Sequence, residues 1–458
     1  MNVRKLVKKF IPSKLFKKIE PYGHLAEAVL FNAINGFPAK GLKVIGVTGT
    51  NGKTTTCYLI HRMLREAGYD TGLMTTVAYG VNDDIRPQQY HMTNVTVPEL
   101  MKRLKFMKSQ GVEWLVLETT SQGLAQNRVW GVPYSVAVLT NITHEHLDYH
   151  GTFERYVDAK KKLFTLTNKN RKGLRVGVIN ADDPSAEVFA AAIAKPIMYG
   201  QDAGDLKATD VKLTPDGSRY SAQYTGQASV LSKPLPATDN TQQATQNYST
   251  FDIECKLPGS FNVANSLAAA GVGIALGLTK EQIERGISSL ERVEGRMDPI
   301  DEGQDFSVIV DFAHTPDSFE KLFKDLRPVV KGKLICMFGS AGRRDEAKRA
   351  IQGQLAGEYC DEVIITEEDD RDIDGQEIMD QIAKGVESAG KIRDKDLFLV
   401  HDRSEAIEFA LKRAGKGDTV LLLGKGHEKI IERADGEHPW DEIATTREGI
   451  NKLKHKFD

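Results

Sequence analysis

The 458-residue sequence has no apolar run close to the ~20 residues that a helix needs to cross a bilayer. It has little net charge, a formal -2, so bulk charge gives no reason to expect nucleic acid as a partner. It is poor in cysteine, and its four cysteines show no CxxC spacing, which argues against a zinc site or a disulfide framework. We therefore expect a protein of the reduced cytoplasm. Its length predicts more than one domain.

The N-terminus lacks the uninterrupted apolar core and the small-residue cleavage site of a signal peptide. Its first 18 residues instead contain seven Lys or Arg and no acid, with apolar residues between them. Two interpretations stay open. In the first, residues 1–20 rest on an anionic membrane surface as a basic amphipathic patch. In the second, they form a solvated terminus that packs a few apolar residues on the next domain. Residues 24–34 have the pattern of a helix.

A phosphate-binding pattern follows at residues 43–59, KVIGVTGTNGKTTTCYL. An apolar strand leads into a glycine turn, and Lys53, Thr54 and Thr55 open a helix. Glycines let backbone N–H groups close around an anion, Lys53 adds a point charge, and the Thr54 hydroxyl suits a magnesium ion that bridges phosphates. A strict Walker A loop has a further glycine where this chain has Val47, so the loop is a variant. A plain glycine turn explains the glycines but not the Lys-Thr-Thr, and we favour a nucleotide site.

Buried strands and amphipathic helices alternate from residue 42 to about residue 295, which is typical of a parallel sheet with helical crossovers. One short apolar strand ends at Glu118 and another ends at Asn141. Ligands of such sheets bind beyond the carboxyl ends of the strands, so we expect Lys53, Glu118 and Asn141 to converge on one edge. Glu118, in the position of a Walker B acid, suits a magnesium ion shared with Thr54.

Residues 141–151, NITHEHLDYHG, are unusually dense in metal-ligand residue types for a loop. They include His144, His146 and His150 together with two acids. Histidine and carboxylate groups both ligate metals. Zinc bound by His144 and His146 is an alternative, but no cysteine and no HExxH pattern supports it.

The sequence pattern changes at two places after residue 151. Residues 225–250 are rich in Ser, Thr, Gln and Asn and predict a mobile insertion in a β region, without chemistry. Residues 290–298 mark the passage into a second series of strands and helices. We therefore predict an α/β fold with a short basic segment at 1–40, a central P-loop ATPase-like parallel sheet domain at 41–295, and a C-terminal Rossmann-like domain at 296–458.

Several motifs occur in order between residues 42 and 446, and together they are highly specific. They are GVTGTNGKTTT at 46–56, ETTSQGLAQNRV at 118–129, TNITHEHLDYHGTFERYVDAKKKLF at 140–164, NADDP at 180–184, GRMD at 295–298, DFAHTPDS at 311–318 and GKGHE at 424–428. On these motifs the chain resembles the ATP-dependent Mur ligases, and most closely the branch that adds the third amino acid to the peptidoglycan peptide.

The resemblance implies an amide-bond-forming ligase that uses ATP and two Mg²⁺ ions. ATP phosphorylates the peptide's terminal carboxylate, an amine attacks the acyl phosphate, and ADP and phosphate leave. The implied catalytic residues are Lys53, Glu118, His146 and a carbamylated Lys160. Thr54 and Glu118 are expected to hold one Mg²⁺, and His146 to help hold the second. The implied nucleotide contacts are Gly49, Thr50, Asn51, Gly52, Lys53, Thr54, Thr55, Asn141, Arg296 and His314.

The resemblance also implies two substrate sites. Positions that match the muramoyl-peptide site are Thr96, Pro98, Ser121 and Arg128, and positions that match the site of the incoming amino acid are Arg344, Arg371, Gly424 and Glu428. The family's amino-acid selectivity motif Asp-Asn-Pro-Arg reads Glu-Asp-Asp-Arg at 368–371. The arginine can pair with a distal carboxylate and the added acids favour a cation, so we expect a diamino acid, meso-diaminopimelate ahead of lysine.

Two further departures bear on the substrate. The basic segment 1–40 stands where the family has a domain that grips the uridine diphosphate, so an acceptor on another carrier is an alternative. Gln122 stands where the family usually has a histidine. We expect a monomer acting on small molecules. One competing hypothesis is a folylpolyglutamate-synthetase-like ligase, against which the His-rich segment and GKGHE argue. The other is a non-catalytic nucleotide-binding scaffold of the cell-wall machinery, against which intact Lys53, Glu118, His146 and Lys160 argue.

Overall fold

The computed structural model describes residues 13–88, 93–143, 147–214, 217–226 and 248–454. His144, His146 and residues 227–247 of the predicted mobile insertion lie outside the described residues. The chain divides into two compact units. The first comprises residues 1–211, 220–253 and 264–289, and the second comprises residues 212–219, 254–263 and 290–458. No helix of the described residues is long and apolar enough to cross a membrane.

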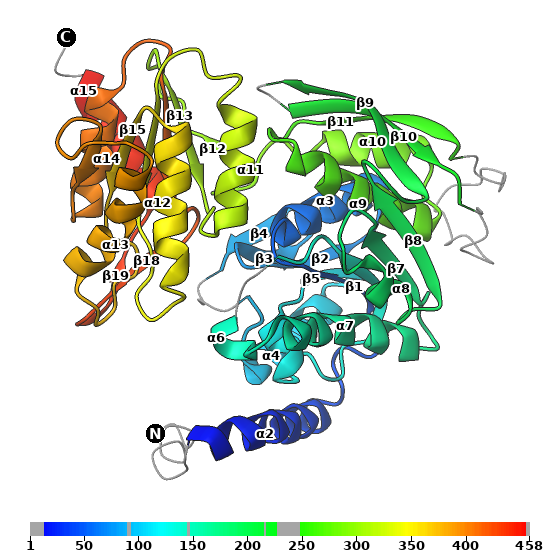
Figure 1. Cartoon of the computed structure of the whole chain (residues 1–458). Helices are drawn as coiled ribbons and strands as arrows, with labels where there is room; N and C mark the ends of the chain where they lie inside the picture. The colour runs from blue at the N-terminus through cyan, green and yellow to red at the C-terminus, as the bar shows by residue number, and fades with distance from the viewer. Residues whose placement is uncertain (1–12, 89–92, 144–146, 215–216, 227–247, 455–458) are drawn as a thin grey trace. The chain divides into compact units, whose positions relative to one another are not determined.

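The larger sheet has parallel strands at its centre, as the alternation of strands and helices predicts (Figure 1). Strand β1 (Lys43–Thr48) lies between β5 (Trp114–Glu118) and β6 (Tyr134–Leu139), and both pairings are parallel. The order in the described residues is β11-β10-β9-β8-β7-β6-β1-β5-β2-β3-β4. The remaining strands are β2 (Thr71–Met74), β3 (Ala78–Val81), β4 (Asp84–Pro87), β7 (Val176–Asn180), β8 (Lys195–Gly200), β9 (Leu206–Thr214), β10 (Gly217–Tyr224) and β11 (Thr250–Cys255).

Helices cover both faces of this sheet, which explains why its central strands are apolar along their whole length (Figure 1). Helices α4 (Val97–Ser109) and α7 (Phe153–Lys169) lie on one face, and α3 (Lys53–Glu66), α9 (Phe261–Leu276) and α10 (Lys280–Ser288) lie on the other. The short helices α5 (Ser121–Ala125), α6 (Leu147–His150) and α8 (Ala186–Ala190) complete the first unit.

The first described helix, α2 (Ser13–Ile34), is longer than the sequence predicts. The sequence predicts a helix only over residues 24–34, and Pro21 lacks the backbone donor that a helix interior normally uses. The structure corrects this, since the helix continues through Pro21. Asn127 Nδ2 donates to the Pro21 carbonyl at 3.2 Å, and Asn32 Nδ2 donates to the Trp130 carbonyl at 3.1 Å. These two hydrogen bonds hold α2 on the first unit.

The second unit contains a sheet in the order β12-β13-β17-β14-β15-β16, which is parallel except for β12. Its strands are β12 (Asp298–Pro299), β13 (Ser307–Asp311), β14 (Leu334–Phe338), β15 (Glu362–Ile365), β16 (Leu397–Leu399) and β17 (Thr419–Leu423). Its helices are α11 (Pro316–Leu326), α12 (Ala347–Tyr359), α13 (Gly375–Ser388), α14 (Arg403–Arg413) and α15 (Glu442–Lys454). The predicted α/β fold is confirmed. A hairpin of β18 (Ile430–Arg433) and β19 (Gly436–Pro439) was not predicted.

Candidate active site

The glycine turn lies between β1 and α3, and its backbone requires glycine at two positions. Gly52 caps α3 with φ 79°, a left-handed conformation that favours glycine. Gly49 has φ 150°, and a Cβ there would lie 1.9 Å from Thr140 Oγ1. The loop therefore approaches the end of β6 too closely for any side chain at residue 49. The helix that follows directs its N-terminus at the loop, which is the arrangement that binds phosphate.

The end of β6 holds the loop in place through Asn141. Its backbone carbonyl accepts from Thr50 N at 2.7 Å, and its Oδ1 accepts from Asn51 N at 2.9 Å. Thr140 Oγ1 donates to the Asn51 carbonyl at 2.6 Å. The predicted convergence of this strand end with the loop is therefore what the structure shows.

Glu118 lies next to the first turn of α3. Its Oε2 accepts from Thr54 Oγ1 at 2.9 Å and from Thr76 N at 3.0 Å, and its Oε1 accepts from Thr76 Oγ1 at 2.9 Å. The carboxylate is buried, with 2% of the residue exposed. Hard oxygen groups in contact, one of them anionic, form the kind of donor set that Mg²⁺ prefers. Thr76 has no motif around it, and sequence reasoning missed it.

Two lysines flank the loop in different environments. Lys53 Nζ donates to the Thr50 carbonyl at 2.7 Å. Lys160, from α7, is 2% exposed and donates from Nζ to the Gly49 carbonyl at 2.5 Å. Its ammonium lies 4.6 Å from the centre of the Tyr156 ring, and the Tyr156 hydroxyl hydrogen-bonds Thr50 Oγ1 at 2.9 Å. Within the triplet 160–162, Lys160 is buried, whereas Lys161 and Lys162 are only partly buried.

The four positions assigned to the muramoyl peptide differ in burial. Ser121 is buried and its Oγ lies 3.0 Å from His150 Nε2. Arg128 is buried and donates to the carbonyl of Asn94, whose Nδ2 donates to the Glu118 carbonyl at 2.8 Å. Thr96 and Pro98, at the start of α4, are exposed. Asn94 therefore contacts both Arg128 and the backbone of Glu118, and the sequence did not reveal these contacts.

In the second unit, Arg296 and His314 gather around Phe312. The Arg296 guanidinium carbon lies 4.6 Å from the centre of the Phe312 ring, and His314 Nδ1 lies 2.8 Å from the Phe312 carbonyl. The buried carboxylate of Asp311 accepts from Met297 N and Ala313 N at 2.6 and 2.7 Å. Burial raises the pKa of Asp311, and the charge of Arg296 opposes that rise.

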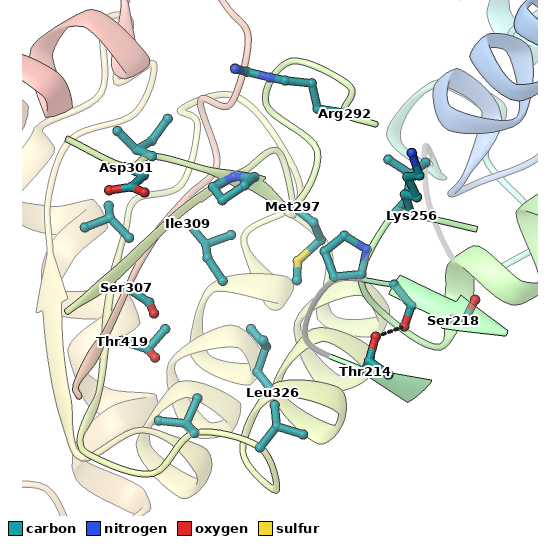
Figure 2. A pocket seen from close by; sticks show the side chains of 18 of the residues that line it. Thr214, Ser218, Lys256, Arg292, Met297, Asp301, Ser307, Ile309, Leu326 and Thr419 are labelled. Carbon is teal, nitrogen blue, oxygen red and sulfur yellow. Dashed lines mark hydrogen bonds between the residues drawn. The ribbon is translucent and has the colours of Figure 1, made fainter. Parts of the chain in front are cut away.

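Arg296 also borders a pocket of about 1370 Å³ whose lining residues all belong to the second unit. Figure 2 shows Met297, Ile309 and Leu326 on its apolar wall, with Lys256 and Arg292 at its margin. Apart from Arg296, no residue that the sequence assigns to a site lines this pocket.

The residues that match the amino-acid site follow β15 and β17. Arg371 donates from Nε to Glu432 Oε2 at 2.7 Å and from Nη1 to the Gly342 carbonyl at 2.5 Å. Glu428 Oε2 accepts from the fully buried Lys425 at 2.7 Å. Gly424 has φ 101°. Arg344 is exposed in the loop after β14. Sequence reasoning missed Lys425, although it lies within the GKGHE motif.

Sequence profiles of two families match the chain. The Mur ligase middle domain matches residues 47–273, and the Mur ligase glutamate ligase domain matches residues 295–426. The chain belongs to the Mur ligase family. Members of this family are ATP-dependent ligases that form amide bonds. The resemblance inferred from the short motifs is therefore confirmed.

The similarity to individual Mur ligases extends over nearly the whole chain. The UDP-N-acetylmuramyl-tripeptide synthetase of Roseiflexus sp. (strain RS-1) is 39% identical over 94% of this chain and 83% of its own length. The UDP-N-acetylmuramoyl-L-alanyl-D-glutamate–2,6-diaminopimelate ligase of Geobacillus thermodenitrificans is 37% identical over 95% of this chain and 84% of its own length. A solved diaminopimelate ligase of the same name is 30% identical, with TM-score 0.58, over 91% of this chain and 80% of that chain.

A similar fold also occurs in a protein of much lower sequence identity. The folylpolyglutamate synthase of Mycobacterium tuberculosis has TM-score 0.68 at 16% identity, covering 94% of this chain and 95% of that chain. At this identity the likeness shows the fold alone.

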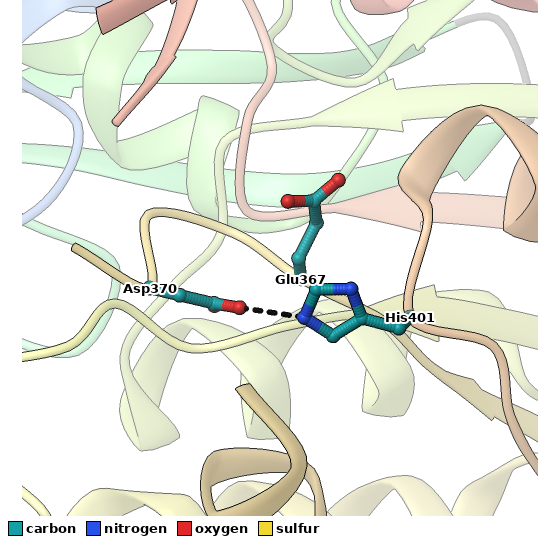
Figure 3. Close-up of side chains that lie close together, drawn as sticks. All are labelled: Glu367, Asp370 and His401. Carbon is teal, nitrogen blue, oxygen red and sulfur yellow. Dashed lines mark hydrogen bonds and ion pairs between the residues drawn. The ribbon is translucent and has the colours of Figure 1, made fainter. Parts of the chain in front are cut away.

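In this Mur ligase the described residues of the first unit bring together the loop 49–55, Asn141, Glu118 and Lys160. His146, the expected ligand of a second ion, lies outside the described residues. A different group, Glu367, Asp370 and His401, places its candidate ligand atoms within 4.8 Å of one another (Figure 3). Glu367 is paired with Arg433 at 2.6 and 2.8 Å, so a cation already neutralises this carboxylate and a metal site does not follow.

Proposed function

We propose that this Mur ligase adds the third amino acid, a diamino acid, to a muramoyl dipeptide in peptidoglycan precursor synthesis. The relatives named for this reaction support the proposal at 37 to 39% identity. One structural observation carries it: the contact of Thr54 with Glu118 beside a glycine loop at a helix N-terminus. A phosphate loop next to a buried carboxylate is what phosphoryl transfer to a substrate acid requires.

The proposed reaction has two steps. The acceptor's carboxylate oxygen attacks the γ-phosphorus of ATP, the bond to ADP breaks, and an acyl phosphate forms. The incoming amine then attacks the acyl carbon, and phosphate leaves with the oxygen that came from the carboxylate. Lys53 and the loop N–H groups stabilise charge on the phosphates. Bound Mg²⁺ supplies further charge neutralisation, and Thr54 Oγ1 and Glu118 are the groups that would hold it, with His146 proposed for a second ion.

We further propose that Lys160 is carbamylated. A carbamate keeps one N–H on Nζ, so the hydrogen bond to the Gly49 carbonyl is compatible with the modification.

The substrate contacts are proposed by position. Thr96, Pro98, Ser121 and Arg128 would bind the muramoyl peptide, and Arg296 and His314 would contact the nucleotide. The amino acid would bind at Arg344, Arg371, Gly424 and Glu428. We propose segment boundaries at residues 40 and 295, with the ATP-binding part between them.

We also propose that the enzyme is a cytoplasmic monomer whose residues 1–20 contact a membrane surface peripherally. Helix α2 supports this, because it leaves four large apolar residues exposed: Tyr22, Val29, Leu30 and Ile34. An apolar face next to a basic segment is typical of helices that lie in an anionic interface. Sedimentation with anionic vesicles, but not with neutral ones, tests the contact. The variant Leu30→Asp should lose it and keep its ligase activity.

The ligase proposal is tested by amine-dependent ADP release. We expect ADP release with UDP-N-acetylmuramoyl-L-alanyl-D-glutamate and a diamino acid, and a product whose mass equals the condensed substrates. ADP release with a folate and glutamate would favour the folylpolyglutamate alternative. Nucleotide binding without any turnover would favour the scaffold alternative.

A further inference from the structure

Helix α2 has the reverse of the polarity expected for a helix at a protein surface. Its buried residues include the polar His24 and Asn32, which are 6% and 1% exposed. Its exposed residues in the stretch 21–34 include no charged side chain and recur with the helical period: Tyr22, Gly23, Ala26, Val29, Leu30, Ala33 and Ile34. From residue 22 to residue 34 this apolar stripe is about 18 Å long. A contiguous exposed apolar surface of this kind indicates a binding partner.

The neighbouring elements extend the stripe and add positive charge. Phe37, in the turn after α2, and Phe106, on α4, are 45% and 42% exposed. Helix α4 packs against α2, and Lys108 on α4 donates from Nζ to the Lys40 carbonyl of the turn at 3.0 Å (Figure 1). Within α4 and the turn 35–41, which are described throughout, no acid is exposed and four lysines are: Lys40, Lys102, Lys105 and Lys108. We call the stripe, Phe37, Phe106 and these four lysines the docking surface.

The chemistry of the docking surface fits an anionic bilayer. Apolar side chains beside lysines are typical of helices in a lipid interface, where the apolar groups leave water and the lysines attract anionic head groups. The first 18 residues of the sequence add seven Lys or Arg and no acid. A second copy of the chain fits less well, because a symmetric pair would bring the lysines of both surfaces together. The bilayer is therefore the partner that this surface matches.

Helix α2 also supports the segment that follows α5. Asn127 Nδ2 donates to the Pro21 carbonyl at 3.2 Å, and Asn32 Nδ2 donates to the Trp130 carbonyl at 3.1 Å. Asn127 has φ 54°, a left-handed conformation that asparagine tolerates better than most residues. These contacts lie on both sides of Arg128 in the sequence, and Arg128 is one of the positions proposed for the acceptor. The position of Arg128 therefore depends on α2.

All four positions proposed for the acceptor belong to elements that α2 contacts. Ser121 and Arg128 belong to α5 and the segment after it, which the two asparagine hydrogen bonds attach to α2. Thr96 and Pro98 lie at the start of α4, which packs against α2. When the docking surface lies on a bilayer, the acceptor elements are attached directly to the docked helices. An acceptor held in the same bilayer reaches them without binding from bulk solution.

We propose that the acceptor is carried by a membrane lipid, so that the muramoyl dipeptide enters on a polyprenyl diphosphate rather than on a nucleotide. This rests on the proposed ligase function and names the carrier of its acceptor. Restricting enzyme and acceptor to one surface raises their effective concentration, and the diphosphate of the carrier adds to the negative charge that the lysines attract. Both carriers present the same reacting carboxylate. A nucleotide-carried acceptor therefore still turns over, with a lower kcat/KM.

The experiment measures kcat/KM of the full chain for the dipeptide on polyprenyl diphosphate and on UDP, each with phosphatidylglycerol vesicles. We expect the lipid-carried acceptor to exceed the nucleotide-carried one by at least tenfold. Leu30→Asp and Ile34→Asp should each remove this advantage, and turnover of the nucleotide-carried acceptor shows that the variants are folded. Ile351→Asp, which changes an isoleucine of α12 that is 49% exposed, is the matched control and should keep the advantage.

Vesicle flotation without ATP separates this inference from the ligase proposal. If no ligation product forms, lipid-carried dipeptide in the vesicles should still increase the bound fraction of the protein at least threefold over the same lipid without dipeptide. That result supports the lipid-carried acceptor, and the failure then belongs to the proposed function. A kcat/KM for the nucleotide-carried acceptor that equals or exceeds that for the lipid-carried one overturns the inference. Without turnover, equal flotation with and without the dipeptide overturns it.

Discussion

Thr54 Oγ1 donates a 2.9 Å hydrogen bond to Glu118 Oε2, and so joins the first turn of α3 to the end of β5. Thr76 adds two more donors to the same carboxylate. Three donors around one buried carboxylate hold both of its oxygens in place. The acid of the proposed ATP site is therefore held in place without a bound ligand.

Glu118→Gln should lower amine-dependent ADP release at least about 100-fold, because the amide removes the negative charge that the metal requires. It should also lower the free energy of unfolding by about 1–3 kcal/mol, since the amide N–H₂ meets hydrogen-bond donors. ADP assays and urea unfolding measure the two effects. Glu113→Gln removes a half-exposed acid just before the same strand and serves as the control. Turnover in Glu118→Gln at the wild-type level would refute the assigned role.

Lys53→Ala should abolish amine-dependent ADP release, with a loss of at least about 100-fold, because the loop loses its point charge on the phosphates. The ADP assay at saturating ATP measures this effect. Lys102→Ala, which removes an exposed lysine on α4, should keep full activity. Equal rates for the two variants would exclude a phosphate-binding role for Lys53.

Lys160→Ala should lose activity, and added bicarbonate should restore little of it, because the carbamate has no amine on which to form. Carbon-13 NMR with labelled bicarbonate should show a carbamate signal in the wild type and none in the variant. Lys161→Ala removes the neighbouring, partly buried lysine, which is paired with Asp158, and should behave as wild type. A fully active Lys160→Ala variant would remove the carbamate hypothesis.

Stability should fall in acid through His61, on α3. Burial lowers the pKa of His61 from 6.5 to about 4, against a backbone hydrogen bond with Thr71 that raises it. A depressed folded-state pKa gives stability that is complete above pH 6.5 and is lost as the pH falls toward 4. The loss is roughly 3 kcal/mol at 1.36 kcal/mol per unit. Urea unfolding from pH 7 to pH 4 should show this slope, and it should flatten in His61→Phe.

Breaking the buried ion pair of Arg403 and Glu442 should lower the free energy of unfolding more than breaking a surface ion pair does. Both side chains are fully buried, and Arg403 donates to Glu442 at 2.6 and 2.8 Å. Glu442→Gln removes the carboxylate that hydrogen-bonds the buried guanidinium, which costs about 3–5 kcal/mol of unfolding free energy. Glu408→Gln removes an acid paired with Lys412 and Lys452 at the surface and should cost less than about 1 kcal/mol. Similar losses in both variants would contradict this account.

Strand ends and glycines made much of the proposed ATP site predictable. Because parallel strands end on one edge of a sheet, Lys53, Glu118 and Asn141 were expected to converge, and the structure places the loop against Glu118 and Asn141. Thr76 and Asn94 were missed because each acts through contacts distant in sequence, without a local pattern.

In the second unit, too, contacts between residues distant in sequence could not be predicted. Glu368-Asp369-Asp370-Arg371 gave a charge pattern, but not its pairing. The partners Lys425, Arg433 and Glu432 come from segments more than fifty residues away, so periodicity and composition do not reveal them. The length of α2 was underestimated because tertiary hydrogen bonds at Pro21 and Asn32 offset the local preference of proline.

Isotope transfer tests the central claim most directly. The dipeptide acceptor is labelled with ¹⁸O in the carboxylate that joins the amine, and the phosphate released with ADP is analysed by mass spectrometry. Activation as an acyl phosphate predicts one ¹⁸O atom in each phosphate released. Unlabelled phosphate, formed together with the amide product, would contradict it.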